Sequence, residues 1–167
     1  DPEIGKIIAD AYKQIGKDGI ISVENSPTIG YSSEVVKGTR FNKGFISPYF
    51  INDQEKYHTV LENPFVLIVD RRIAANSQIQ NVMEYVIKSG NPNILIIADS
   101  VEGEALASLV LNHQRQICNV CCVTPPHALG LKKEWMKDIA ILTGATVVSE
   151  EAGILLENVD PGYLGIA

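Results

Sequence analysis

The first apolar residues of the chain recur every three or four positions, the spacing of an amphipathic helix. Asp1-Pro2 supplies an N-terminal cap and a first-turn proline, and Gly16 is a residue type that commonly ends a helix. The pattern therefore predicts a helix at the start of the chain. Its apolar stripe consists of Ile4, Ile7, Ile8, Ala11 and Ile15.

After this helix the pattern changes. Asp18-Gly19 is a turn signal, and it precedes a predicted strand, Ile20–Val23. The polar stretch Glu24–Gly30 then separates this opening from the rest of the chain. We place a domain boundary near Ser32–Lys37, with residues 1–36 in one domain and residues 37–167 in another.

The stretch Phe41–Asn52 is rich in aromatic residues but is interrupted by Gly44 and by Pro48. Because proline cannot donate a hydrogen bond to a strand ladder, we expect an irregular extended segment here. A short strand is predicted next, at Thr59–Leu61.

From residue 65 onward, apolar strand patterns alternate with helical patterns. Such alternation predicts parallel strands covered by helices, which makes a three-layer α/β domain. The predicted strands are Phe65–Asp70, Asn93–Asp99, Cys118–Val123 and Thr146–Ser149, and the predicted helices are Ser77–Ser89, Glu102–Gln114 and Leu131–Leu142.

The predicted helix Glu102–Gln114 has apolar residues around much more of its circumference than one core-facing stripe needs. Ala105 and Leu109 share one side, Leu106 and Val110 share another, and Leu111 lies between them and the polar face. Such a helix is either buried on two sides or leaves an apolar strip in water, and an exposed strip usually marks a binding site. The pattern alone leaves both alternatives open.

The charge balance excludes one class of partner. The formal net charge is −6, whereas binding to nucleic acid depends on Lys and Arg that neutralise phosphates. The apolar runs are also far too short to span a bilayer, so we expect no membrane segment. Three cysteines, Cys118, Cys121 and Cys122, lack the further ligands of a zinc site. We expect buried, reduced thiols and a reducing compartment.

Enzyme motifs are missing: the chain contains no Gly-x-Gly-x-x-Gly, no P-loop and no His-Glu-x-x-His. Asp70 and Asp99 end two predicted strands, where open α/β sheets place ligand-binding groups. A small-ligand or nucleotide-binding α/β domain is therefore the alternative hypothesis.

Several runs of the chain closely resemble segments of the group I chaperonins, bacterial GroEL and its organellar relatives. They occur in the order of that family and cover nearly the whole chain. The runs are GKIIADAYKQIGKDGIISVEN, KGFISPYFIN, ENPFVLIVDRRI, VEGEALASLVLN and KDIAILTGATVVSEE.

The resemblance implies that residues 1–36 are the end of the intermediate, hinge-side domain and that residues 37–167 are the apical domain. It implies a three-layer swivelling β/β/α fold of the apical type. The family's equatorial domain, which binds ATP and Mg²⁺, has no counterpart here, so we expect no cofactor and no ATPase activity of this chain. The start at Asp1 and the end in mid-pattern at Ala167 lead us to expect a piece of a longer protein.

In the family, one apolar groove between two helices binds both non-native polypeptides and the mobile loop of a GroES-type co-chaperonin, and the subunits form a double ring. The positions that match this groove are Phe45, Tyr49, Phe50, Gln80, Met83, Leu106, Val110, Leu111 and Asn112.

The chain departs from the family pattern at several of these positions. Gln80 replaces a leucine, Phe45 replaces a tyrosine, and Lys43 stands where the family usually has an arginine. The loop Pro125–Gly130 is also unlike its relatives. These departures indicate a divergent member, from a mitochondrial matrix or plastid stroma if eukaryotic and from the cytoplasm if bacterial.

Overall fold

A computed structural model describes residues 2–16, 21, 23, 25, 29–35, 38–126 and 130–167. The chain divides into two compact units, Asp1–Arg40 and Phe41–Ala167. This division lies close to the boundary expected between residues 36 and 37, and we describe each unit by itself.

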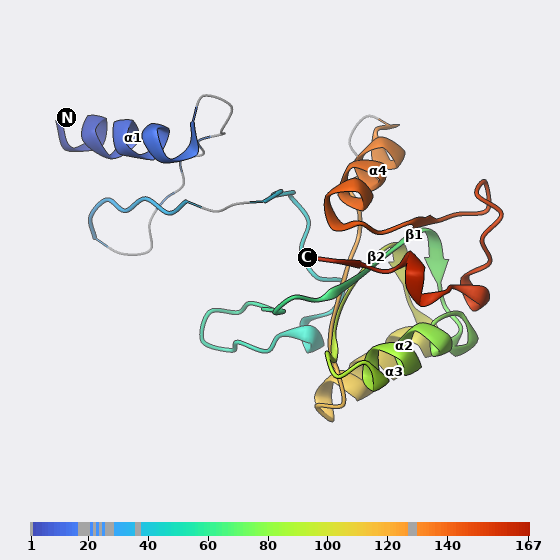
Figure 1. Ribbon diagram of the computed structural model, residues 1–167. Helices are drawn as coiled ribbons and strands as arrows, with labels where there is room; N and C mark the ends of the chain where they lie inside the picture. The colour runs from blue at the N-terminus through green and yellow to red at the C-terminus, as the bar shows by residue number, and fades with distance from the viewer. Residues whose placement is uncertain are drawn as a thin grey trace. The chain divides into compact units, whose positions relative to one another are not determined.

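The first unit contains the predicted N-terminal helix, α1, over Pro2–Ile15 (Figure 1). Gly16 follows it with a φ of 76°, a left-handed conformation that glycine adopts without a steric penalty. Its N–H donates to the Tyr12 carbonyl at 3.0 Å. No described residue of α1 is buried within the unit. The predicted strand Ile20–Val23 falls largely outside the described residues.

The second unit is built on a five-stranded sheet, and its four longest predicted strands are confirmed. Three run parallel in the order β3-β2-β1, β4 adds in parallel to the other edge of β1, and β5 pairs antiparallel with β1. The strands are β1 (Phe65–Ile73), β2 (Asn93–Val101), β3 (Asn119–Val123), β4 (Val147–Val148) and β5 (Gly165–Ile166).

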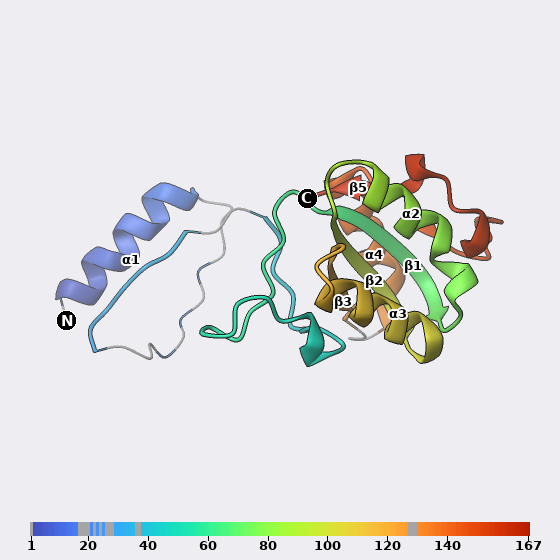
Figure 2. The same cartoon turned by 90° about the horizontal axis from the view of Figure 1, so that it is seen from below.

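Helices cover both faces of this sheet. In β1, Leu67 and Val69 point to the face covered by α2 (Gln80–Lys88) and α3 (Gly103–Gln114), whereas Val66 and Ile68 point to α4 (Lys132–Thr143). This period-2 alternation is what a strand buried on both faces requires. Figures 1 and 2 show α2 and α3 together on one side of the strands and α4 on the other. The three layers predicted from the alternation are confirmed as helix, sheet and helix.

A second β layer, expected from the resemblance, is not formed by the residues that the structure describes. Outside the sheet these residues pair only at two isolated bridges, Phe45 with Val123 and Asp53 with His58. The swivelling β/β/α arrangement therefore stays a prediction.

The short strand predicted at Thr59–Leu61 is wrong, and the reason is a side chain. Asn52 donates from Nδ2 to the Val60 carbonyl at 2.6 Å and accepts the Val60 N–H at Oδ1 at 2.9 Å. The carboxamide thus takes both backbone groups that a strand partner would use. The expected irregular segment before it is confirmed, apart from a short 3₁₀ helix, η1, over Pro48–Phe50.

The helix predicted from Ser77 begins later. Residues Asn76–Gln78 form a 3₁₀ turn, and Gln78 Oε1 accepts the backbone N–H groups of Ala74 and Ala75 at 2.8 and 2.9 Å. This local bonding delays the α-helix to Gln80. None of the helices in the described part of the chain has the length and apolar character needed to cross a membrane.

Candidate functional site

The short helix η1 sends its two aromatic residues in opposite directions. Ser47 caps it by accepting the Tyr49 N–H at Oγ, at 3.4 Å. Tyr49 is 63% exposed, whereas Phe50 is fully buried and meets the ring of His113 edge to face at 5.9 Å between centroids. The expectation that Phe50 lines an exposed groove is therefore wrong. Its role is to pack η1 against α3.

Phe45 is also separated from the rest of the predicted site. It forms an antiparallel bridge with Val123, and the adjacent Ile46 N–H donates to the Cys122 carbonyl at 2.7 Å. Its ring packs against the core on the α4 side of the sheet and lies 6.3 Å from the Tyr57 ring. Phe45 thus lies on the face opposite α2 and α3, and it cannot share a surface with their side chains.

Helix α2 presents two different flanks. On one flank Asn81 donates to the Glu157 carbonyl at 2.7 Å, and Tyr85 packs edge to face on Phe65. With 3.6 residues per turn, Gln80 and Ile87 lie on the other flank, which faces α3. Gln80 is exposed there and Ile87 is 40% exposed.

Met83, another predicted site residue, lies between this flank and the core. Only 7% of its surface is exposed, because it packs in the main hydrophobic cluster with Val82 and Val86. The prediction that Met83 offers an open contact is wrong for this conformation. Ile87, one turn further along, is the aliphatic side chain that α2 exposes on this flank, and its spacing from Met83 and Gln80 was the missed sequence signal.

Helix α3 has three kinds of surface. Ala105 and Leu109 are fully buried, as predicted, and His113 joins them. Leu106 and Val110 are half-buried on the flank toward η1, where they pack against the edge of the core. Figure 2 shows α3 with η1, in teal, on one side and α2 on the other.

The side of α3 that faces away from the core shows whether the helix is buried on two sides or leaves an apolar strip in water. We call this side the outer crest. Leu111 lies on this crest and is 46% exposed, so the helix is not sealed on two sides. Asn112 is half-buried on the flank toward α2, and its Nδ2 donates to the Ser108 carbonyl at 2.8 Å. The excess apolar character of α3 therefore produces an apolar strip that water reaches.

These side chains come from η1, α3 and α2 on one side of the sheet, and we call this set the α2–α3 surface. Its members are Tyr49, Gln80, Ile87, Leu106, Val110, Leu111 and Asn112. Six of them were expected from the sequence and Ile87 was not. The surface holds no catalytic constellation, since its groups are apolar side chains, carboxamides and one phenol.

His113 fastens α3 to the sheet beneath this surface. The Val120 N–H of β3 donates to His113 Nδ1 at 3.0 Å, so the ring proton sits on Nε2. Burial lowers the pKa of His113 from its ordinary 6.5. The neutral imidazole is therefore part of the folded structure, because a protonated Nδ1 could not accept the Val120 N–H.

The two aspartates of the alternative hypothesis lie near the carboxyl ends of β1 and β2, which continue past them to Ile73 and Val101, and a lysine binds both. Lys132 Nζ lies 2.6 Å from Asp70 Oδ1 and 2.8 Å from Asp99 Oδ1. Burial disfavours the charge on Lys132, but the hydrogen bonds and negative charges of the two aspartates outweigh it and raise its pKa. One positive charge from within the fold is thus shared by the two carboxylates, and a cation bound between them would have to displace Lys132.

Neither of the other candidate chemistries finds support. Among the described residues, no group of three or more His, Cys, Asp or Glu side chains is placed to hold a metal ion. Cys118, Cys121 and Cys122 are free and buried, as predicted. Burial raises the pKa of Cys118 and of Cys121 to about 11, so these thiols stay protonated and pack as small apolar groups.

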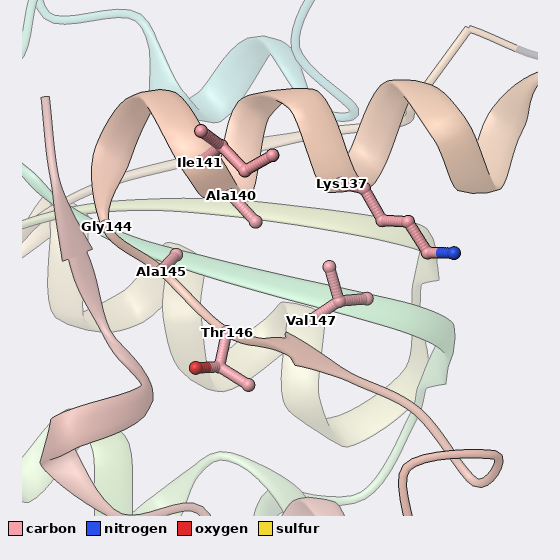
Figure 3. Close-up of a pocket in the computed structure, with 7 residues that line it drawn as sticks. All are labelled: Lys137, Ala140, Ile141, Gly144, Ala145, Thr146 and Val147. Carbon is pink, nitrogen blue, oxygen red and sulfur yellow. The ribbon is translucent and has the colours of Figure 1, made fainter.

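A shallow pocket of about 550 Å³ lies on the opposite face, between α4 and β4 (Figure 3). The Ile141 side chain and the aliphatic stem of Lys137 lie along its helix side, and Val147 lies on its strand side. Ile141 is 79% exposed. The pocket has few polar groups, so it offers no chemistry beyond apolar contact.

No protein-family model matches the chain. A solved structure does: the chaperonin gp146 from the bacteriophage EL 2 (Pseudomonas aeruginosa), crystallised in the presence of ATP-BeFx. The two share 20% sequence identity with a TM-score of 0.66, and the match covers 100% of this chain. It covers 32% of gp146. The chain therefore has the fold of part of a chaperonin and spans about a third of the chaperonin that it matches.

Proposed function

We propose that this chain is the polypeptide-binding part of a chaperonin and that it holds non-native proteins on the α2–α3 surface. The observation that carries the proposal is Leu111, 46% exposed on a helix whose opposite side is fully buried, with half-buried Leu106 and Val110 beside it. An apolar strip maintained in water on a well-packed core is typical of a binding surface. The chaperonin-type fold supports the same function.

The mechanism follows from apolar burial. A non-native chain exposes apolar side chains, and burying them yields about 25 cal/mol for each Å² removed from water. This interaction has no direction, so selectivity for sequence is low, as a general holder of clients requires. In a ring, several copies would bind one client together, and weak contacts would add up to avidity.

The proposal extends to the longer protein of which this chain would be a piece. Residues 1–36 would belong to the intermediate domain and residues 37–167 to an apical domain of the swivelling type. The mobile loop of a GroES-type co-chaperonin would displace clients from the same surface, and sister subunits would complete a double ring. ATP and Mg²⁺ would act in an equatorial domain outside this chain, which would itself have no catalytic role. A mitochondrial matrix, a plastid stroma or a bacterial cytoplasm would keep the buried thiols reduced.

Suppression of aggregation tests the function directly. The chain is added without ATP to a chemically denatured client enzyme, and light scattering is followed over time. We expect the chain to suppress the scattering and the variant Leu106→Ser/Val110→Ser to lose that activity with an unchanged far-UV circular dichroism spectrum. Leu111→Ser, at a more exposed position, provides a second variant with little risk to folding.

The matched control is Ile141→Ser/Leu142→Ser on α4, because these residues are 79% and 66% exposed on the opposite face of the sheet. It should suppress aggregation as well as the unmodified chain does. If both α3 variants keep full activity, or if the α4 variant loses it, the assignment to the α2–α3 surface is wrong.

A further inference from the structure

Strand β3 lies at one edge of the sheet that the structure describes. Its outward-facing backbone groups are met by parts of the chain other than a strand. The Val120 N–H donates to His113 Nδ1 at 3.0 Å, and the Cys122 carbonyl accepts the Ile46 N–H at 2.7 Å. Alternate residues of a strand direct their backbone groups to the same side, so Val120 and Cys122 both face away from β2. The edge is thus closed from within the fold.

The segment Phe41–Ser47, which we call the strap, covers the second half of this edge. Within it, Phe45 pairs with Val123 in an isolated antiparallel bridge. The Phe45 side chain packs on the cluster at the α4 face of the sheet, whereas the Ile46 side chain packs on the cluster at the α3 face. Consecutive side chains that point to opposite faces are a property of strands. The strap therefore extends the sheet by one short antiparallel stretch.

The strap is held less extensively than a strand of the sheet. It meets β3 at an isolated bridge, whereas β2 pairs with β3 along its whole length. Residues 42–44 of the strap are exposed. At its start the Phe41 ring meets the Trp135 ring of α4 edge to face, at 4.6 Å between centroids. The strap is therefore fastened at its two ends, and releasing it leaves the pairing of β1, β2 and β3 intact.

We propose that the outer edge of β3 is a strand-addition site for extended segments of other polypeptides, and that the strap occupies it as an internal substitute. This site is separate from the α2–α3 surface and does not depend on it. The strap shows which chemistry fits: an antiparallel segment in which an aliphatic residue directly follows an aromatic one. The N–H of the aliphatic residue donates to the Cys122 carbonyl, and the two side chains cover the two faces of the sheet edge.

The strap competes with every external segment because it belongs to the same chain. A short tether gives an effective concentration in the millimolar range, so an external segment binds weakly as long as the strap is in place. Loosening the strap should therefore strengthen external binding. Phe45→Ser removes the aromatic contact of the strap with the α4 face and leaves the residues of β3 unchanged.

A fluorescent peptide with the sequence of residues 41–47 tests the site, and its dissociation constant is measured by anisotropy with the whole chain. We expect Phe45→Ser to bind this peptide about tenfold more tightly than the unmodified chain does, because the internal competitor is weakened. Phe41→Ser loosens the other end of the strap and should act in the same direction. Ile141→Ser, at a 79% exposed position of α4, is the control and should bind like the unmodified chain. Equal dissociation constants for the unmodified chain and both strap variants would overturn the proposal.

A second peptide separates strand addition from apolar binding without direction. It carries a methyl group on the backbone nitrogen of its isoleucine, so it lacks the donor for the Cys122 carbonyl but keeps both apolar side chains. It should bind Phe45→Ser about tenfold more weakly than the first peptide does, since a hydrogen bond is lost and an acceptor is left without its partner. If the two peptides bind equally, the edge of β3 is not the site.

The unmodified chain gives a test that does not depend on whether the variants fold. Trp135 is the only tryptophan of the chain, so its emission reports the contact with Phe41. Saturating peptide should shift this emission and speed the hydrogen exchange of the Ile46 N–H, because the strap leaves β3. Unchanged exchange at saturation would overturn the proposal. Leu111→Ser should bind the peptide like the unmodified chain, and a loss of binding there would place the peptide on the α2–α3 surface instead.

Discussion

Helices α3 and α4 cover opposite faces of one sheet, have the same length, and both leave large aliphatic side chains in water. The exposure is greater on α4, where Ile141 is 79% and Leu142 is 66% exposed, than on α3, where Leu111 is 46% exposed. Exposure of single residues therefore does not identify the binding face.

What distinguishes the two helices is their surroundings. Leu111 shares α3 with half-buried Leu106 and Val110, which pack against the edge of the core, and η1 and α2 lie on the same side of the sheet. Ile141 instead borders a shallow pocket of small residues, and α4 is fastened at its first turn by the ion pairs of Lys132. Apolar residues that are exposed beside half-buried ones on the same helix indicate a surface that can bind a chain, whereas single exposed apolar residues are ordinary.

The largest effect should come from removing the cation that fastens α4. Lys132→Met leaves the carboxylates of Asp70 and Asp99 close together without their shared partner. We expect the free energy of unfolding in urea to fall by about 3 kcal/mol, because a removed partner leaves partly buried charge uncompensated. Lys133→Met, whose partner Glu151 is exposed, should lower the free energy of unfolding much less, because an exposed ion pair adds little to stability. Equal costs would contradict the difference in burial.

Removing the aromatic contact under α3 should have an effect of similar size. Phe50→Ala creates a cavity between η1 and α3, and a loss of about 3 kcal/mol in the free energy of unfolding is expected. The neighbouring Tyr49→Ala should change stability by no more than about 0.5 kcal/mol, since its side chain is mostly in water. If Tyr49→Ala lowered the free energy of unfolding more than Phe50→Ala, the conclusion that Phe50 points inward and Tyr49 points to solvent would be wrong.

Acid should weaken the α3 side of the molecule through His113. Its pKa is lowered in the folded chain, so its contribution to stability is complete above the ordinary pKa of 6.5 and declines as the pH falls below it. We expect the urea midpoint to drop between pH 7.5 and pH 5.5 by more than in His113→Asn, which keeps an acceptor for the Val120 N–H. Identical pH profiles would exclude this role.

The smallest change in stability should come from the crest of α3. Leu111→Ser should alter the free energy of unfolding by no more than about 0.5 kcal/mol, because the side chain is largely exposed. It should nevertheless reduce the capacity to hold a denatured client, measured by light scattering. A large loss of stability would mean that Leu111 belongs to the core, and the comparison with α4 would then lose its basis.

Much of the fold follows from local pattern. The helix at Pro2–Ile15, the parallel strands and the helices between them were predicted because their apolar periods are strong and their caps and glycines agree with them. The errors in the predicted secondary structure arose where a side chain took the hydrogen bond that a backbone partner would have made. Asn52 removed the strand at Thr59–Leu61, and Gln78 delayed α2.

The candidate site was predictable only in part. A resemblance placed nine residues on one groove, but it could not reveal which of them point inward. Phe50 and Met83 are buried in the core, Phe45 lies on the other face of the sheet, and Ile87, which no family position indicated, is exposed on α2. The direction of a side chain depends on helix rotation and on neighbours distant in sequence, and a motif contains neither.

The sequence by itself determined the α/β class, the parallel sheet, the buried thiols and the surplus of apolar residues on α3, because periodicity and composition are local properties. Only the tertiary structure decided that this surplus reaches water at Leu111, that Lys132 binds both Asp70 and Asp99, and that Phe50 and Met83 are buried. These outcomes depend on which distant groups fold against each side chain, and that is settled by packing.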